Sequence, residues 1–281
     1  MVGDGKLKIA ILLTCHNRKS VTLQCMKNVC KCWNCVHQFD FWVVDDGCTD
    51  GTAEGIRGLN LGCCVNLVQG SGHDYWAGGM RRAWNAAIES GTDYDGYLWL
   101  NDDTMLFPSA LETLVRPVGT AGIVVGVVSD LVGKTMTYGG RARDMRPVPI
   151  DGTYRDVQTF DGNCVLVSRS AFEKIGGMSD YVTHAIGDND YGLRATEAGI
   201  RIVQTPCFVG TCEKSDYKPD WTKSSVPLIK RIRNLYSPLG YSQAQVYFHF
   251  NRIHFGVFYA VRLWIHQHIR VLFPWIWERF K

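Results

Sequence analysis

The first hundred residues alternate between short, continuous apolar runs and polar segments with helical spacing. The apolar runs cover about 9–14, 39–44, 65–68 and 96–100. Runs of this length are typical of strands buried on both faces, as in a parallel sheet. Between them we expect helices over about 19–32 and 77–90, a short helix capped by Thr49 or Asp50, and another with Pro108 in its first turn. This alternation predicts an α/β fold with a doubly wound, mainly parallel sheet.

The second half of the chain is less regular. Strands are expected over about 123–128, 164–167 and 200–205, and helices over about 170–175 and 187–198. The stretch 133–159 is rich in Gly, Pro and Arg, so we expect a mobile or hairpin region there. After Cys212 the composition shifts to Lys, Tyr, Trp and Pro, which places a domain boundary near Lys214.

Length and charge narrow the domain organisation and the function class. With 281 residues, the chain has room for one α/β domain of about two hundred residues and an appendage. We therefore expect a catalytic domain over 1–214, in halves of about 1–105 and 106–214, and a helical extension over 215–281. The net charge of +3 argues against a nucleic-acid partner, which needs a concentrated basic face.

The eleven cysteines favour reduced, partly buried thiols in a cytosolic protein. The alternative is a zinc site at Cys32-x-x-Cys35, but no second CxxC pair follows it. No signal peptide is expected, because a strand begins by about Lys8. No run reaches the roughly 18 apolar residues that a membrane-spanning helix needs.

Polar clusters follow three of the predicted strands, at Thr14–Arg18, Asp45-Asp46 and Asn101–Thr104. In a doubly wound sheet, ligands bind at the carboxyl ends of strands. Adjacent carboxylates such as Asp102 and Asp103 repel each other unless a cation intervenes, and oxygen ligands suit Mg²⁺ or Mn²⁺. Such an ion would neutralise the charge of a diphosphate leaving group. The simpler interpretation of each cluster is a solvated acidic turn.

Asp188 and Asp190 open a predicted helix far downstream. Two residues apart on a helix, they cannot point in the same direction. One would face the cleft and deprotonate an acceptor hydroxyl, and the other would cap the helix. The simpler alternative is that they only complement the helix dipole.

Taken in order, these motifs resemble glycosyltransferase family 2, whose members are inverting enzymes of the GT-A fold. The resemblance covers about residues 7–212. It is carried by Thr14–Arg18, by Val44–Thr52 (similar to the family's VDDGSTDGT run), by Ala77–Asn85, by Leu100–Thr104 (similar to its DxD motif) and by Gly187–Arg194 (similar to its ED.D...R segment). Three positions depart from the pattern: Cys48 replaces Ser, Asn101 replaces the first Asp, and Gly187 replaces Glu.

The resemblance implies a role for each motif. The residues implied at the nucleotide are Thr14, His16, Asn17, Arg18, Asp45, Asp46, Gly79, Arg82, Asn101 and Asp102. The diphosphate would be held by Arg81 or Arg82 and by Mn²⁺ or Mg²⁺ bound to Asp103. Asp188 is the implied general base, with Asp190 as the alternative. Trp76, Asn163 and His184 are candidates for contact with the acceptor or sugar.

The third metal ligand is open, because many relatives have a His after the last core strand and this chain has Phe208–Cys212 there. Cys212 is a candidate, although a thiol is soft for Mg²⁺. The implied partners are a nucleoside-diphosphate sugar and a glycan or lipid-linked acceptor, as in cell-surface polysaccharide assembly.

A long amphipathic helix is expected from Gln243 to about Phe273. At 100° per residue, its cationic side chains fall in a sector of roughly 80°; these are Arg252, Arg262, His266 and Arg270. The residues broadly opposite are Phe250, Ile253, Val257, Val261 and Trp264. With Trp275 and Trp277, this pattern predicts a helix on an anionic membrane surface, at the inner face of the cell membrane. The alternative is a helix packed against the catalytic domain or against a second copy in a homodimer.

Two other functions compete with glycosyl transfer. A nucleotidyltransferase that makes sugar nucleotides would need a Gly-rich, basic loop after the first strand, and this chain has Thr14–Arg18 there. The changes at Asn101 and Gly187 leave open an inactive sugar- or membrane-binding homologue.

Overall fold

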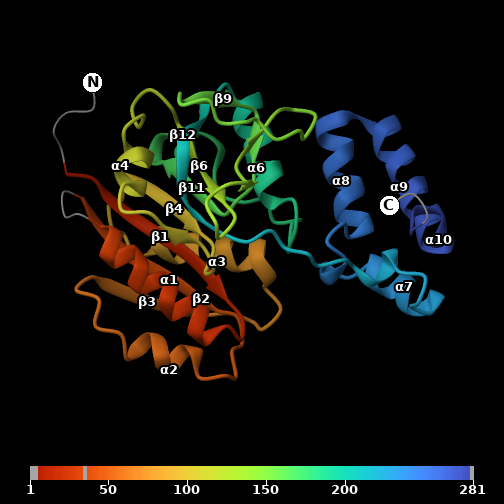
Figure 1. The fold of residues 1–281 in the computed structure, drawn as a ribbon, viewed down its shortest axis with the longest axis horizontal. Coiled ribbons are helices and arrows are strands. Elements are labelled where there is room, and N and C mark those ends of the chain that lie inside the picture. The colour runs from red at the N-terminus through yellow and green to blue at the C-terminus, as the bar shows by residue number, and fades with distance from the viewer. Residues whose placement is uncertain (1–5, 34–36, 279–281) are drawn as a thin grey trace.

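The computed structural model describes residues 6–33 and 37–278 (Figure 1). Its main sheet runs in the order β3-β2-β1-β4-β11-β6-β12-β5. The strands on this path are β1 (Lys8–Cys15), β2 (Gln38–Asp45), β3 (Cys64–Gln69), β4 (Gly96–Leu100), β5 (Met105–Leu106), β6 (Ile123–Ser129), β11 (Cys164–Ser168) and β12 (Ile202–Thr211). The continuous apolar runs of the sequence form these strands because both faces of the sheet are covered.

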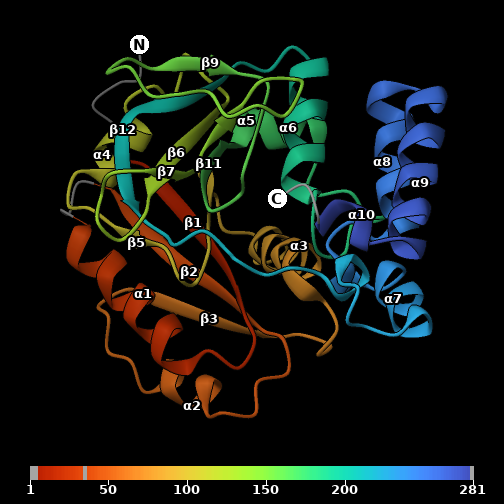
Figure 2. The same ribbon diagram turned by 45° about the vertical axis from the view of Figure 1, so that its right-hand side comes forward.

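The first half of the sheet is parallel. β1 pairs in parallel with β2 and β4, and β2 pairs in parallel with β3. Alternate residues of β1 pack on opposite sides: Ile11 lies in one core with α1 (Lys19–Cys32) and α2 (Thr52–Arg57), and Leu12 lies in the other with α3 (Tyr75–Glu89). Figure 2 shows the sheet between these helices. The predicted doubly wound α/β architecture is confirmed.

The second half of the sheet is mixed. β11 is antiparallel to both β4 and β6, and β12 returns parallel to β6. β12 is longer than the predicted run 200–205, because register shifts after Gln204 and after Phe208 carry pairing on to Thr211. The helices of this half are α4 (Ala110–Val115), α5 (Arg169–Ile175) and α6 (Gly187–Glu197).

The Gly-, Pro- and Arg-rich stretch forms short strands at the rim of the sheet. They are β7 (Met136–Tyr138), β8 (Gly140–Arg141), β9 (Arg155–Val157) and β10 (Thr159–Phe160). β7 pairs with β6, β9 pairs with β12, and β8 pairs with β10. The hairpin form of the expectation for 133–159 therefore holds for part of that segment.

The C-terminal extension is helical, as predicted, but its long helix is not continuous. It contains α7 (Leu228–Leu235), α8 (Ala244–Phe255), α9 (Val257–Leu272) and α10 (Trp275–Glu278), with 3-10 turns at Asp220–Thr222 and Pro238–Gly240. The single helix expected from Gln243 to Phe273 is wrong, because Gly256 adopts a φ of +90° and turns the chain. α8 and α9 then lie side by side (Figures 1 and 2).

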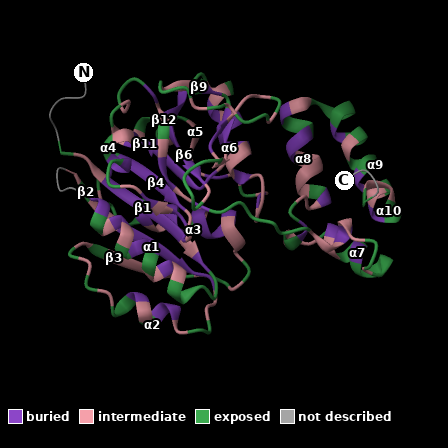
Figure 3. Ribbon diagram, viewed as in Figure 1, coloured by how far each residue is buried: buried purple, intermediate pink, exposed green. Residues whose placement is uncertain are grey.

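This break separates residues that the sequence placed on one helix. Arg252 lies on α8, whereas Arg262, His266 and Arg270 lie on α9, so the common cationic sector does not form. On the opposite side, Phe250 is buried, while the other four apolar residues expected there remain exposed. Figure 3 shows exposed and half-buried residues predominating on the extension, in contrast to the buried sheet.

The extension docks on the α/β part of the chain near α6. The His249 ring of α8 packs edge-on against the Tyr181 ring, with 4.5 Å between the ring centroids. The Tyr241 ring packs against the His184 ring, with 5.1 Å between centroids. Arg143 donates to the backbone oxygen of His254 at 3.1 Å. Over the described ranges 6–33 and 37–278, no helix combines the length and the apolar character needed to cross a bilayer.

Candidate functional site

An arginine from the end of β1 bridges the two carboxylates at the end of β4. Arg18 Nη1 donates to Asp102 Oδ1 and Arg18 Nη2 to Asp103 Oδ2, each at 2.8 Å. Thr22 Oγ1 donates to the other oxygen of Asp102 at 2.9 Å. Burial raises the pKa of Asp102 to about 6 against the lowering effect of Arg18. The cation that the sequence required beside this acidic pair is, in this structure, a guanidinium.

Asp103 is the carboxylate of the pair that a metal ion can reach. Its side chain is 34% exposed, whereas Asp102 is buried. Its second neighbour is Cys212, whose Sγ lies 3.4 Å from Asp103 Oδ1. Burial, with the charge of Asp103, raises the pKa of Cys212 to about 12, so the thiol is protonated and acts as a donor. Cys212 therefore lies beside Asp103 as a protonated thiol in this structure.

The side chains at this site fit a hard divalent cation whose other ligands come mostly from the substrate. Among the described residues, no group of three or more His, Cys, Asp or Glu is arranged to hold a metal ion. Mg²⁺ in proteins is commonly held by one or two carboxylates and by substrate phosphates. Asp103 meets that requirement once Arg18 releases its Oδ2.

Trp76 connects the Asn101–Asp103 group to Asp188. Its Nε1 donates to Asn101 Oδ1 at 2.7 Å. A Cβ on Gly162 would lie 2.5 Å from the Trp76 ring and 3.1 Å from Asp188 Cβ, so the three residues are in close contact. Only glycine fits at 162 between the indole and the carboxylate.

Asp188 is a half-buried carboxylate in the first turn of α6. It accepts hydrogen bonds from the backbone N–H groups of Gly162 and Asn189, both at 2.8 Å. Burial foremost, and then the charge of Asp161, raise its pKa to about 6 despite those two donors. A carboxylate with a pKa near the working pH is suited to general base catalysis.

Asp190 points elsewhere, as the two-residue spacing predicted. It is buried and accepts from Ser179, Tyr181, Arg194 and His254. Burial alone would raise its pKa, but these hydrogen bonds and the Arg194 charge lower it to about 2. Because its oxygens are filled by four donors, Asp190 serves to join α6 to the extension.

The two acidic residues after β2 hold neighbouring loops. Asp46 accepts from the backbone N–H groups of Gly72, Asp74 and Tyr75 and so fixes the start of α3. Asp45 accepts from the N–H of Cys48 at 2.8 Å. Both are buried.

The residues after β1 line the same edge. His16 Nδ1 lies 2.6 Å from the backbone oxygen of Asp46, and Asn17 Oδ1 accepts from the N–H of Thr49 at 2.7 Å. Thr14 packs against α3: a Cβ on Gly79 would meet its Oγ1 at 2.2 Å. Thr14 and Gly79 thus fix how closely α3 approaches β1.

The two arginines of α3 are held by protein groups. Arg82 Nε donates to Asp74 at 2.6 Å, and Arg82 lowers the pKa of Asp74 to about 2. Arg81 donates to the backbone oxygens of Ser179 and Val182.

The remaining two acceptor candidates also have protein neighbours. Asn163 Nδ2 donates to Cys212 Sγ at 3.4 Å, and its backbone oxygen accepts from Asn101, which places it beside Asp103. His184 lies between the rings of Tyr75 and Tyr241, with a buried Nδ1 that has no hydrogen-bond partner within the described residues. Burial lowers the pKa of His184. It lies where the catalytic domain meets the extension.

Two contributors have roles that the sequence did not indicate. Asp161, expected with Asn163 on the acceptor side, raises the pKa of Asp188 and is ion-paired with Arg141 at 2.8 Å. His254, which belongs to no motif, reaches Asp190 from 64 positions away. Tertiary packing brings both to the site.

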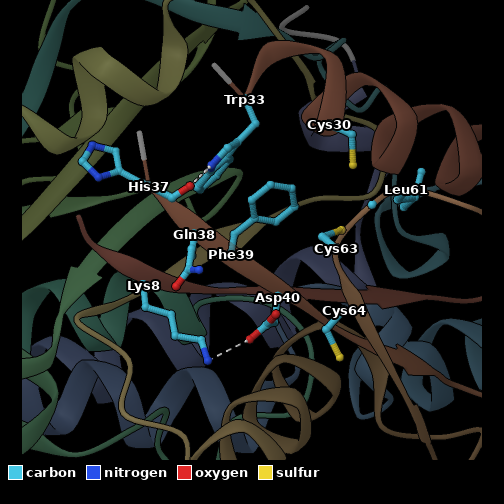
Figure 4. Close-up of a pocket in the computed structure, with 11 residues that line it drawn as sticks. Lys8, Cys30, Trp33, His37, Gln38, Phe39, Asp40, Leu61, Cys63 and Cys64 are labelled. Atoms are coloured by element: carbon cyan, nitrogen blue, oxygen red, sulfur yellow. Dashed lines mark hydrogen bonds and ion pairs between the residues drawn. The ribbon is translucent and has the colours of Figure 1, made fainter. Parts of the chain in front are cut away.

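A cavity of about 450 Å³ lies at the other end of the strands (Figure 4). It is lined by the amino ends of β1, β2 and β3, where Lys8 Nζ lies 3.6 Å from Asp40. The described cysteines, including Cys30 and Cys63 here, are free thiols. Cys35 lies outside the described residues, so the zinc alternative stays a prediction. The polar strand ends are at the opposite edge, which separates this cavity from the candidate site.

Comparison with known proteins gives one family and several structural neighbours. Glycosyl transferase family 2 matches residues 10–176. No curated protein sequence gives a significant match.

Three solved structures share the fold at low identity. A mannosyltransferase, PcManGT from Pyrobaculum calidifontis, in complex with GDP-Man and Mn²⁺, has a TM-score of 0.55 and 15% identity over 94% of this chain and 74% of that one. TarS of S. aureus has a TM-score of 0.55 and 14% identity, over 89% of this chain and 44% of that one. GalNAc-T7 with UDP, GalNAc and Mn²⁺ has a TM-score of 0.59 and 13% identity, over 82% of this chain and 48% of that one. This chain therefore spans less than half of the latter two.

The match covers more than half of the chain, and the chain shares the GT-A fold of its structural neighbours. With the motif residues gathered at the strand ends, the chain belongs to glycosyl transferase family 2 and is a glycosyltransferase.

Proposed function

We propose that this glycosyltransferase inverts the anomeric centre as it moves a sugar from a nucleoside diphosphate to an acceptor hydroxyl. The observation that carries the proposal is the placement of Asp188. Its carboxylate, with a pKa of about 6, accepts from the N–H of Gly162, and Gly162 packs against Trp76, which is hydrogen-bonded to Asn101. A base and a diphosphate-binding edge are therefore adjacent.

Asp188 takes the proton of the acceptor hydroxyl. The hydroxyl oxygen forms its bond to the anomeric carbon as the bond from that carbon to the diphosphate oxygen breaks. Attack from the face opposite the leaving group inverts the configuration in one step. The backbone N–H groups of Gly162 and Asn189 hold the carboxylate in place, which limits the entropy lost in reaching the transition state.

The diphosphate lies, in this proposal, at Asp103 and Arg18. A bound Mn²⁺ or Mg²⁺ would neutralise the charge of the leaving group, with Asp103 as its protein ligand. For Asp103 to hold a cation, Arg18 would have to give up its hydrogen bond to Asp103 Oδ2, and its planar guanidinium suits a phosphate group. Asp102 stays with Thr22 and keeps Arg18 at the site.

The nucleoside is assigned to the edge formed by the ends of β1 and β2. The proposed contacts come from His16, Asn17 and Asp45, with Thr14, Gly79 and Asn101 shaping the edge. Asp46 accepts three backbone N–H groups and Asp45 only one, so Asp45 has more capacity left for a base or ribose. Arg82, held by Asp74, is a second candidate for the diphosphate.

The acceptor is a glycan or a lipid-linked sugar, with Trp76, Asn163 and His184 on its side of the site. A lipid-linked acceptor would place the enzyme at the inner face of the cell membrane, in cell-surface polysaccharide assembly. The helical extension is then the part of the chain that meets the bilayer.

A donor screen tests the proposal. UDP, GDP, dTDP and their common sugar conjugates are added with Mn²⁺, and the melting temperature and nucleotide release are followed. We expect one nucleotide class to stabilise the protein by several degrees at saturation, because ligand at about 100 times Kd adds about 2.7 kcal/mol. No stabilisation and no release with any member would contradict it.

A further inference from the structure

Helix α9 carries an apolar face that nothing in the described structure covers. Seven of its exposed residues fall within a sector of about 140° at 100° per residue. They are Val257, Phe258, Val261, Trp264, Ile265, Ile269 and Leu272. The adjacent side of α9, with Ala260, Gln267 and Val271, is buried within the extension. Phe258 is 91% exposed, an unusual position for a large aromatic side chain.

The charge of the extension differs from that of the rest of the chain. Residues 215–281 hold ten Lys or Arg and three Asp or Glu, a net charge of +7, whereas residues 1–214 carry −4. On α9, Arg262 lies at the edge of the apolar face, and His266 and Arg270 follow it around the helix toward the opposite side. An apolar face bordered by cations is typical of helices that lie in the interface of an anionic bilayer.

Two arginines of the extension lack an anion. Arg231 on α7 is only 9% exposed, and its Nε and Nη1 are buried with no hydrogen-bond partner in the described residues. Arg270 Nε is likewise unpartnered, and its guanidinium lies over the ring of Trp221 at 5.2 Å. Unpaired buried guanidinium nitrogens are costly unless an anion reaches them. Both groups face the interior of the extension, so they add to its positive charge without lying at the exposed face of α9.

We infer that the outward face of α9 binds an anionic phospholipid bilayer, with Arg262 at its edge and the net charge of the extension attracting the anionic headgroups. The apolar side chains insert at the interface, and Trp264 and Trp275, both exposed, lie at headgroup depth. A second copy of the chain would also cover the apolar face, but it would bring two extensions of net charge +7 together. The inference rests on the proposed function only for the role that membrane binding would serve. Lipid binding itself needs neither the sugar donor nor the metal ion.

The test is co-sedimentation of the full chain with vesicles. One set contains about 30% phosphatidylglycerol in phosphatidylcholine, and the other is pure phosphatidylcholine. We expect at least about tenfold tighter binding to the anionic set, since each cation near such a surface contributes about 1 kcal/mol. Phe258→Asp with Ile265→Asp should lower binding by more than about tenfold.

Matched variants separate the apolar from the electrostatic contribution to vesicle binding. Leu131→Asp changes a side chain that is 69% exposed in the catalytic domain and should leave binding unchanged. Arg262→Met should weaken binding to the vesicles that contain phosphatidylglycerol by about fivefold, the equivalent of about 1 kcal/mol, and leave the weak binding to phosphatidylcholine unchanged. Circular dichroism and donor-induced stabilisation confirm that each variant is folded.

Three results would overturn the inference. They are no binding to either vesicle, equal binding of the wild type to both, and a dimer in light scattering that Phe258→Asp dissociates. The last would show that a second copy covers the face. Donor binding is measured separately, so failure here leaves the proposed transfer reaction standing.

Discussion

Asp188→Asn should lower turnover by about 10²–10⁴-fold while donor affinity stays within about twofold of the wild type. Asn keeps the size of the side chain, and its oxygen still accepts from the Gly162 N–H, but it cannot take a proton. Turnover is measured by nucleotide release in the presence of acceptor, and donor affinity by calorimetry.

The same residue sets the acid limb of the pH profile. The base acts when ionised, so a pKa raised to about 6 removes activity as the pH falls through about 6, tenfold per unit below it. Asp161→Asn should move this limb to lower pH, because the Asp161 charge raises the pKa of Asp188 and its loss also frees Arg141. A limb that stays in place would show that another group titrates.

Asp190→Asn is the matched control two residues away. It removes a buried charge from His254 and Arg194, so we expect a loss of about 1–3 kcal/mol in the free energy of unfolding. The folded protein should retain the chemical step. If Asp188→Asn were fully active and Asp190→Asn inactive at unchanged stability, the base would be Asp190.

Asp103→Asn should abolish tight binding of Mn²⁺ with the nucleoside diphosphate and lower turnover by on the order of 10³-fold. Asp103 is the exposed member of the acidic pair, and among the described residues no group of three or more His, Cys, Asp or Glu could hold the ion in its place. Binding is followed by the loss of the free Mn²⁺ signal in electron paramagnetic resonance.

A carboxylate outside the site provides the control for Asp103. Asp180, whose side chain is 98% exposed, is changed to Asn and should leave Mn²⁺ binding unaltered. If Asp103→Asn bound Mn²⁺ and turned over as the wild type does, Asp103 would not be the metal ligand. The metal-binding role assigned to the segment similar to the DxD motif would then be wrong.

Local patterns predicted the catalytic domain well. The runs at 9–14 and 96–100 became β1 and β4 because burial on both faces leaves a continuous apolar signal. The helix at 19–32 matches α1 in both bounds. The divergence of Asp188 and Asp190 followed from helix geometry alone.

Tertiary contacts decided what those patterns missed. The break at Gly256 depends on α8 and α9 packing together, and the sequence there continues a helical pattern on both sides. The bridge from Arg18 to Asp102 and Asp103 spans more than eighty positions. All three residues could be identified from the sequence as site candidates. That the arginine is hydrogen-bonded to both carboxylates could not be predicted from it.

The most direct test of inversion is the configuration of the first product. The donor identified in the screen is incubated with enzyme and Mn²⁺, with water as acceptor, and proton NMR follows the anomeric signals before mutarotation. A donor with an α-linked sugar should give the β-anomer first, in step with nucleoside diphosphate release. Initial formation of the α-anomer would contradict single displacement with Asp188 as base.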